Sequence, residues 1–134
     1  MTKKFLFITT LFFYLSSCST IKPFNNASII GKWESKNEIV FEFFENSKCS
    51  FNVPYKNTVQ TLQGIFFINN SKNLKTIDIK KIDGVSFSFY GIFDFVDENM
   101  IKISKFSTSR KTRPISFEKN NFLILNRKKI NGSN

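Results

Sequence analysis

The sequence predicts an all-β protein, folded as a small antiparallel barrel or sandwich of about eight or nine strands. Short runs rich in β-branched and aromatic residues follow one another from Ile29 onward, separated by clusters of turn residues. Apolar residues alternate within these runs, and no segment sustains the 3.6-residue period of an amphipathic helix. Closure into a barrel removes exposed strand edges, which are a hazard for strands so rich in phenylalanine, and a barrel is therefore favoured.

The expected strands are defined by alternation and bounded by turns. In the longest run Phe87, Phe89 and Phe93 share one face with Gly91, at which we expect a bend or bulge. The expected strands are Ile30–Glu34, Glu38–Glu45, Cys49–Val53, Leu62–Ile68, Lys75–Lys81, Val85–Phe95, Met100–Phe106, Pro114–Glu118 and Phe122–Lys128. Looser connections are expected at Pro54–Thr61 and Ser107–Arg113.

The N-terminus has the pattern of an export signal. Lys3 and Lys4 precede the apolar run Phe5–Leu15, which is shorter than the roughly 20 residues that a membrane-spanning helix needs. The following Leu15-Ser16-Ser17-Cys18 resembles the lipobox of bacterial lipoproteins. This resemblance implies cleavage before Cys18 and a diacylglycerol on its sulfur. An ordinary secretory signal with an incidental cysteine is the alternative interpretation.

The expected organisation follows from this signal. Residues 1–17 are a signal peptide, 18–29 a lipidated flexible linker, 30–128 the barrel and 129–134 a disordered tail. Two or more acyl chains hold a protein to a membrane stably without spanning it, so the membrane is the expected partner of Cys18. Ser19 and Thr20, rather than Asp, follow the cysteine. By resemblance to enterobacterial sorting this favours the periplasmic side of the outer membrane. In a Gram-positive cell that rule does not apply, and the protein would sit on the outer face of the plasma membrane.

The charge and the cysteine content limit which partners and which disulfides are expected. The chain has 20 Lys and Arg against 10 Asp and Glu, and loss of Lys3 and Lys4 lowers the formal charge from +10 to +8. The cations are scattered, without an arginine-rich face, and the export signal argues against nucleic acid as a partner. Cys49 alternates with inward-facing residues and has no second cysteine once Cys18 is lipidated, so we expect a buried free thiol and no disulfide.

A second resemblance begins at Gly31-Lys32-Trp33. A Gly-x-Trp on the first strand resembles the lipocalins and the shorter bacterial lipocalin-like lipoproteins. Tyr90-Gly91-Ile92-Phe93 and the segment Arg113–Phe117 are similar to features of the shorter group. The resemblance implies an up-and-down barrel whose tryptophan plugs the closed end, with an arginine packed over it, here Arg113 or Arg127. The chain is shorter than ordinary lipocalins and shows no C-terminal helix.

The predicted function is binding without catalysis. A small hydrophobic ligand or lipid would contact Trp33, Phe87, Phe89 and Phe93, which we take as the tentative ligand-binding residues. Alternatively, 14 phenylalanines after Cys18 fill the barrel, Trp33 is a core anchor, and the domain is a protein-interaction or inhibitor module of the cell envelope. The sequence has no histidine and no nucleophile–base pair, so we expect no enzyme activity, catalytic residue, metal site or cofactor.

Overall fold

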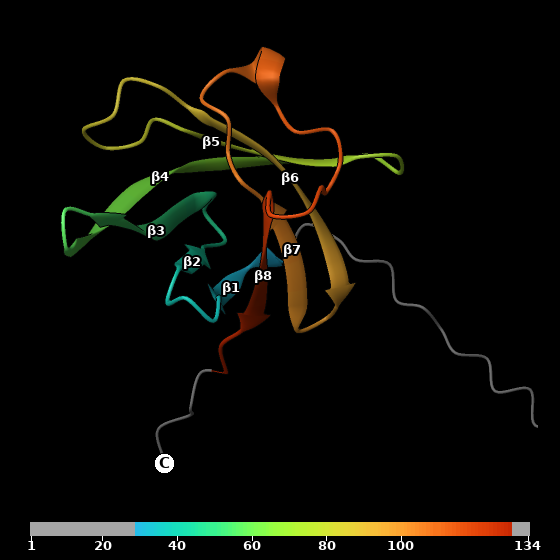
Figure 1. The fold of residues 1–134 in the computed structure, drawn as a ribbon, viewed down its shortest axis with the longest axis horizontal. Helices are drawn as coiled ribbons and strands as arrows, with labels where there is room; N and C mark the ends of the chain where they lie inside the picture. The colour runs from blue at the N-terminus through green and yellow to red at the C-terminus, as the bar shows by residue number, and fades with distance from the viewer. Residues whose placement is uncertain (1–28, 130–134) are drawn as a thin grey trace, which may run out of the picture.

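The computed structural model describes residues 29–129. The expected signal peptide, the lipidated Cys18, the linker up to residue 28 and the tail from residue 130 lie outside the described residues. The described chain forms a closed antiparallel barrel in which each strand pairs with the next and β8 returns to β1 (Figure 1). The strands are β1 Gly31–Glu34, β2 Val40–Phe43, β3 Lys48–Tyr55, β4 Thr58–Asn70, β5 Lys75–Lys80, β6 Phe89–Asp97, β7 Met100–Ser104 and β8 Phe122–Arg127.

The predicted fold class is confirmed: residues 29–129 form an all-β, up-and-down barrel of eight strands. In such a barrel the connections alternate between the two ends. We call the end with the β1–β2, β3–β4, β5–β6 and β7–β8 connections the mouth. The opposite end, where β1 begins and β8 finishes beside each other, is the floor. Among the described residues no helix has the length and apolar character needed to cross a membrane.

Three expected elements differ from the structure. Pro54–Thr61 is a tight hairpin rather than a loose connection, because Lys56 and Asn57 both adopt positive φ, at 43° and 63°, and form a two-residue turn. Pro54 therefore lies within β3, beyond the end of the β2 ladder, where its missing N–H breaks no pairing.

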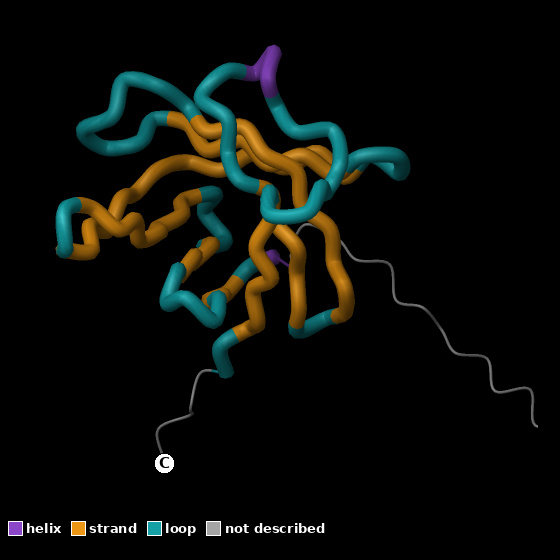
Figure 2. The backbone as a smooth tube through the Cα atoms, in the orientation of Figure 1, coloured by secondary structure: helices purple, strands orange, loops and turns teal. Residues whose placement is uncertain are grey.

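Two further differences lie near the mouth. The chain from Val85 to Ser88 is not a strand, since the Val85 N–H bonds the Ile82 carbonyl and turns the backbone. Pro114–Glu118 is also irregular and belongs to the long β7–β8 connection, which carries the short 3-10 helix η2, Arg110–Thr112, at the top of Figure 2. The expected last hairpin is thus replaced by this connection.

Gly91 pairs regularly with Ile77 on its β5 side. On its other side the register shifts between the Phe93–Ile103 pair and the Tyr90–Ser107 bridge, in addition to the irregularity between Phe95 and Asp97. A Cβ on Gly91 would lie 2.9 Å from the ring of Phe106. The glycine therefore permits the close approach of that ring.

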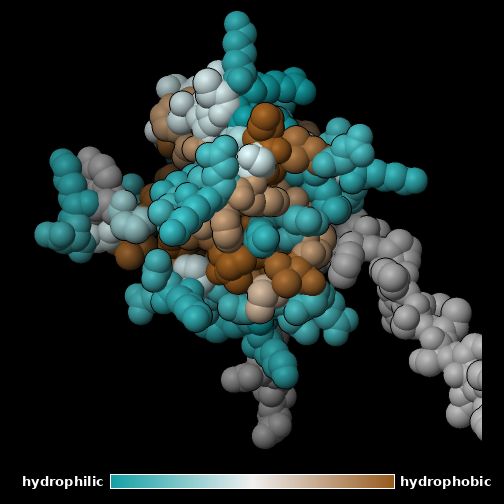
Figure 3. All heavy atoms as spheres, turned by 45° about the vertical axis from the view of Figure 1, so that its right-hand side comes forward, coloured by the Kyte–Doolittle hydropathy of each residue, from teal (hydrophilic) through white to brown (hydrophobic). Residues whose placement is uncertain are grey.

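The β7–β8 connection covers the outer face of β5 and β6. Arg113 forms an ion pair with Asp78 and lies over the Tyr90 ring, 5.5 Å from its centroid. Both charged side chains are almost buried, and Ile92 beneath the connection is fully buried although it points outward from the barrel. Figure 3 shows apolar atoms gathered at the centre of one face, with hydrophilic atoms around them. The connection therefore adds a small second core outside the barrel.

Candidate binding site at the mouth of the barrel

The floor of the barrel is closed by Trp33. Its side chain is fully buried, and its indole N–H donates to the Ile29 carbonyl at 2.8 Å. The guanidinium of Arg127 lies over the ring, 4.1 Å from its centroid, and donates to the Ile30 carbonyl at 2.7 Å. Of the two arginines left open by the sequence, Arg127 therefore packs on the tryptophan. Arg113 lies on the outer face.

Gly31 is the residue that makes this floor possible. Its φ is +125°, a conformation that residues with a side chain rarely adopt. A Cβ at this position would also lie 3.0 Å from Nη1 of Arg127. The spacing of Gly31 and Trp33 thus has a physical cause, since the glycine leaves room for the cation that covers the indole. Burial lowers the pKa of the Arg127 guanidinium, while the nearby Glu98 carboxylate opposes this shift.

Aromatic side chains occupy the middle of the barrel. Phe93 is almost fully buried, and its ring centroid lies 5.8 Å from that of Phe95, which in turn lies 6.4 Å from that of Trp33. On the opposite wall Phe43 meets Phe66 edge-on at 5.0 Å. Trp33 and Phe93, two of the tentative ligand-binding residues, are therefore packed against other rings, in the arrangement of a core.

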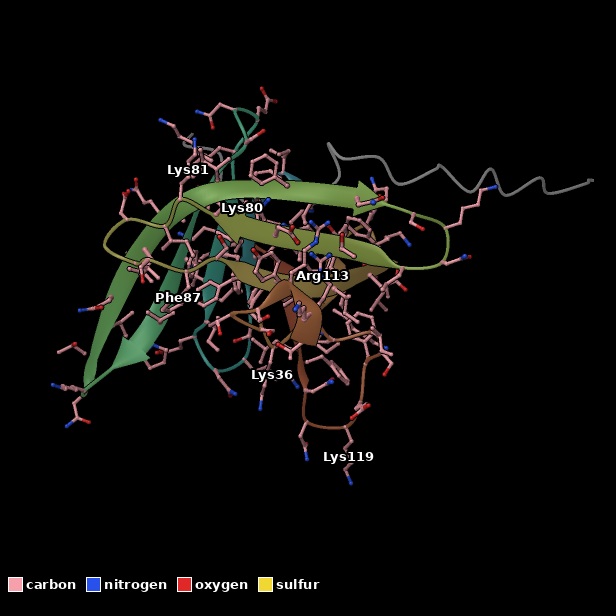
Figure 4. All side chains as sticks on the ribbon, turned by 90° about the horizontal axis from the view of Figure 1, so that it is seen from above. Lys36, Lys80, Lys81, Phe87, Arg113 and Lys119 are labelled. Carbon is pink, nitrogen blue, oxygen red and sulfur yellow. The ribbon has the colours of Figure 1, made fainter. Side chains whose placement is uncertain are left out.

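The other two tentative residues lie together at the mouth. Phe89 is half-buried and contacts Phe51 and Phe106, with ring centroids 5.9 and 5.7 Å away. Phe87 packs on Phe89 at 5.5 Å, and 46% of its surface is exposed. Figure 4 shows Phe87 beside the β5–β6 connection. The mouth thus presents an apolar ring surface to solvent and continues inward into the core.

The β5–β6 connection forms one wall of this mouth. Ile82 is buried and Val85 packs against the core, while the Asp83 N–H bonds the Gln63 carbonyl at 3.0 Å. Gly64 admits Ile82, because a Cβ there would lie 3.2 Å from Cγ1 of Ile82. Lys81, in the same connection, is exposed. The wall on this side of the mouth is therefore apolar, with Ile82 and Val85 packed against the core.

The described residues offer no metal site at the mouth or elsewhere, since no group of three or more His, Cys, Asp or Glu side chains is close enough to hold an ion. Cys49 is buried as expected. Desolvation raises the pKa of its thiol to about 12, against a smaller opposing effect of a backbone hydrogen bond from Gly64. The thiol is therefore protonated at neutral pH and is a poor nucleophile.

Sequence reasoning identified Phe87 and Phe89 but missed Phe106 and Ile82 as residues of the mouth. Phe106 was expected at the end of a strand, and Ile82 in a turn. Both belong to connections that fold back onto the barrel, a tertiary effect that alternation does not report. Their apolar character within polar connections was the available signal.

Comparison with known proteins adds no relative: no protein-family model matches the chain, and neither the curated proteins nor the solved structures contain a significant match. The functional argument therefore rests on the residues of the barrel itself.

Proposed function

We propose that the protein is a membrane-anchored bacterial lipoprotein whose lipocalin-like barrel binds a small hydrophobic molecule or lipid at its mouth. The observation that carries the proposal is the half-exposed ring of Phe87, packed at a tilt on Phe89 at the entrance to an aromatic core. When an acyl chain covers an apolar ring surface of this kind, binding is favoured because apolar area is removed from water. The domain acts by binding, without a catalytic step.

The filled interior limits how such a ligand sits. Trp33 and Phe93 pack against neighbouring rings, so the acyl chain lies across Phe87 and Phe89 rather than along the barrel axis. About seven methylenes on this surface contribute roughly 5–6 kcal/mol at about 0.8 kcal/mol each. That free energy corresponds to a dissociation constant on the order of 0.1 mM. The expected ligand is held weakly and exchanges readily.

Membrane anchoring at Cys18 is the second part of this proposal and rests on the lipobox. Mass spectrometry of the membrane-extracted protein should find a diacylglycerol at Cys18 and no residues before it. The Cys18→Ser variant should leave the membrane fraction for the soluble one. An unmodified Cys18 thiol in the membrane-extracted protein would refute the anchor without bearing on the mouth.

Binding at the mouth is tested with dodecanoate. Titration followed by isothermal calorimetry should give weak binding to the native protein, and Phe87→Ala should weaken it several-fold. Phe67→Ala is the matched control, because Phe67 is similarly exposed, at 51%, but faces outward from β4 under Lys80. Equal affinity of the two variants for dodecanoate would refute the proposal.

The second candidate function is a protein-interaction or inhibitor module of the cell envelope. The ring contacts that run from Trp33 to Phe95 and Phe93 favour it, because a packed barrel is a rigid scaffold for surface contacts. If dodecanoate does not bind, this second function takes precedence. The two functions are separable by these measurements alone.

A further inference from the structure

The barrel is closed between β8 and β1 by a very short ladder of paired residues. Between β1 and β8 the paired residues are Trp33 with Arg127 and Glu34 with Asn126. On its other side β8 pairs with β7 along its whole length, from Asn126 to Phe122. The first half of β8 therefore extends toward the mouth with a partner strand on one edge only.

The backbone hydrogen bonds at the two ends of β8 show which of its residues direct their N–H and C=O groups toward β7 and which toward β1. The Arg127 N–H bonds the Asn99 carbonyl, and the Asn121 carbonyl accepts from Lys105, so odd-numbered residues face β7. The Lys128 N–H bonds the Lys32 carbonyl, so even-numbered residues face β1. Phe122 and Ile124 thus direct their N–H and C=O groups into the seam. Within residues 29–129 no backbone hydrogen bond satisfies these groups.

The seam opens because β1 turns away after Glu34. The hydroxyl of Ser35 accepts hydrogen bonds from the N–H groups of Asn37 and Ile39, at 3.2 and 3.1 Å. Glu38 then adopts a positive φ of 62°, which completes the reversal into β2. The β1–β2 turn is consequently held by its own hydrogen bonds and leaves β8 uncovered.

A groove lies along this uncovered edge, which we call the seam groove. It has a volume of about 510 Å³. Ser35, Lys36 and Asn37 of the β1–β2 turn line one side, and Phe122, Ile124 and Asn126 of β8 line the other. The groove therefore combines unpaired strand groups with apolar side chains at alternate positions, which is what the addition of an extended peptide strand requires.

We propose that the seam groove binds an extended segment of another polypeptide, bearing carboxylates, as an added strand along Phe122–Ile124. Lys36 is the one charged residue in the groove lining, and Lys102 lies over the Phe122 ring, 5.3 Å from its centroid. Glu34, at the end of the groove, is already paired with Lys128 at 3.3 Å. An acidic strand is therefore attracted to this edge. A second copy of the chain, which carries a formal charge of +10, is repelled.

This inference stands apart from binding at the mouth, since Phe87 belongs to the β5–β6 connection and the seam groove lies between the β1–β2 turn and β8. In Figure 4 Lys36 and Lys81 lie on opposite sides of the molecule. Lys81 is thus a suitable control site, because it is exposed, carries the same charge and lies away from the groove.

The test uses the purified chain and a capped peptide of alternating valine and glutamate, about six residues long. Amide hydrogen exchange measured by NMR should be fast at Phe122 and Ile124 in the free protein. The peptide should slow it by at least about tenfold at these two amides, while exchange at Leu123 and Leu125, which already bond β7, stays unchanged. A peptide of alternating valine and lysine should leave all four amides unchanged.

Two variants complete the test. Ile124→Pro removes an N–H that faces the seam and should abolish the effect of the peptide. Lys36→Glu retains that N–H and should weaken binding by about threefold to tenfold, whereas Lys81→Glu should change it by less than about twofold. Unchanged exchange at Phe122 and Ile124, or equal effects of the two lysine variants, would overturn the proposal. Protection of the same amides by concentration-dependent dimerisation would overturn it in favour of a second copy.

Discussion

Arg127 closes the floor of the barrel, and its replacement by leucine should destabilise the fold by about 3 kcal/mol. The variant loses the cation–π contact with Trp33 and the charged hydrogen bond to the Ile30 carbonyl. It also loses the bond from Nε to the Glu98 carbonyl, at 3.1 Å. The first contact contributes about 1 kcal/mol when partly desolvated, and the hydrogen bonds contribute about 2 kcal/mol together, allowing for solvent exposure.

Trp33 is the single tryptophan of the chain and reports directly on this floor. Urea unfolding followed by its fluorescence should give the loss in the free energy of unfolding. Thermal unfolding should show a decrease in Tm of about 12 °C or more for a domain of this size. Arg127→Lys retains the charge but not the planar fork, and should therefore lose about half as much.

The control is Arg110→Leu, which removes the same charge from the exposed helix η2 and should cost less than about 0.5 kcal/mol. Gly31→Ala gives an independent check, because its Cβ would approach Nη1 of Arg127 and its backbone would be strained. The reasoning is refuted if Arg127→Leu and Arg110→Leu are equally stable. It is also refuted if Arg127→Lys matches the native protein.

Three further predictions concern the packing of the barrel and its long connection. Gly91→Ala should destabilise the fold by about 2 kcal/mol because its Cβ would collide with the Phe106 ring, and denaturant unfolding measures this loss. Between about pH 9 and pH 12 the unfolded chain ionises Cys49 while the folded chain keeps its proton. The free energy of unfolding should therefore fall by about 1.4 kcal/mol per pH unit from this group, a contribution that Cys49→Ala removes in urea titrations across that range. Asp78→Leu should leave Arg113 without its ion-pair partner, cost about 2 kcal/mol, and speed amide exchange in η2 while the strands of the barrel stay protected.

The alternation of apolar and polar residues predicted most of the barrel, because each strand buries the side chains of one face only. Ile77 and Ile79 in β5, and Phe41 and Phe43 in β2, point inward as expected, and so does Cys49 in β3. These residues follow a period of two, which is fixed by the local backbone and needs no knowledge of the neighbouring strands.

The turns and the long connection were less predictable. Lys56 and Asn57 form a two-residue turn without the glycine that usually marks one, so the hairpin was interpreted as a loose loop. Pro114–Glu118 has apolar residues typical of a strand, yet they pack on the outside of the barrel beside the Arg113–Asp78 pair. The partner of that pair is 35 residues distant, and no local pattern reports such a contact.

The candidate site was predicted in part for the same reason. Phe87 and Phe89 were recognised because they alternate, although only Phe89 lies in a strand. The choice between Arg113 and Arg127 depended on which arginine lies in the strand that pairs with β1. Strand pairing is a tertiary property that the local sequence does not report. The seam groove could not be predicted from the sequence, because it arises where β1 turns away while β8 continues.

Both ends of the described chain leave the barrel from the floor, since β1 starts and β8 finishes there side by side (Figure 1). The two termini of the described domain are therefore neighbours at the floor, while Phe87 lies at the other end of the barrel. Two labels, one before Ile29 and one after Lys129, should lie close together, and the distance between them would test this arrangement.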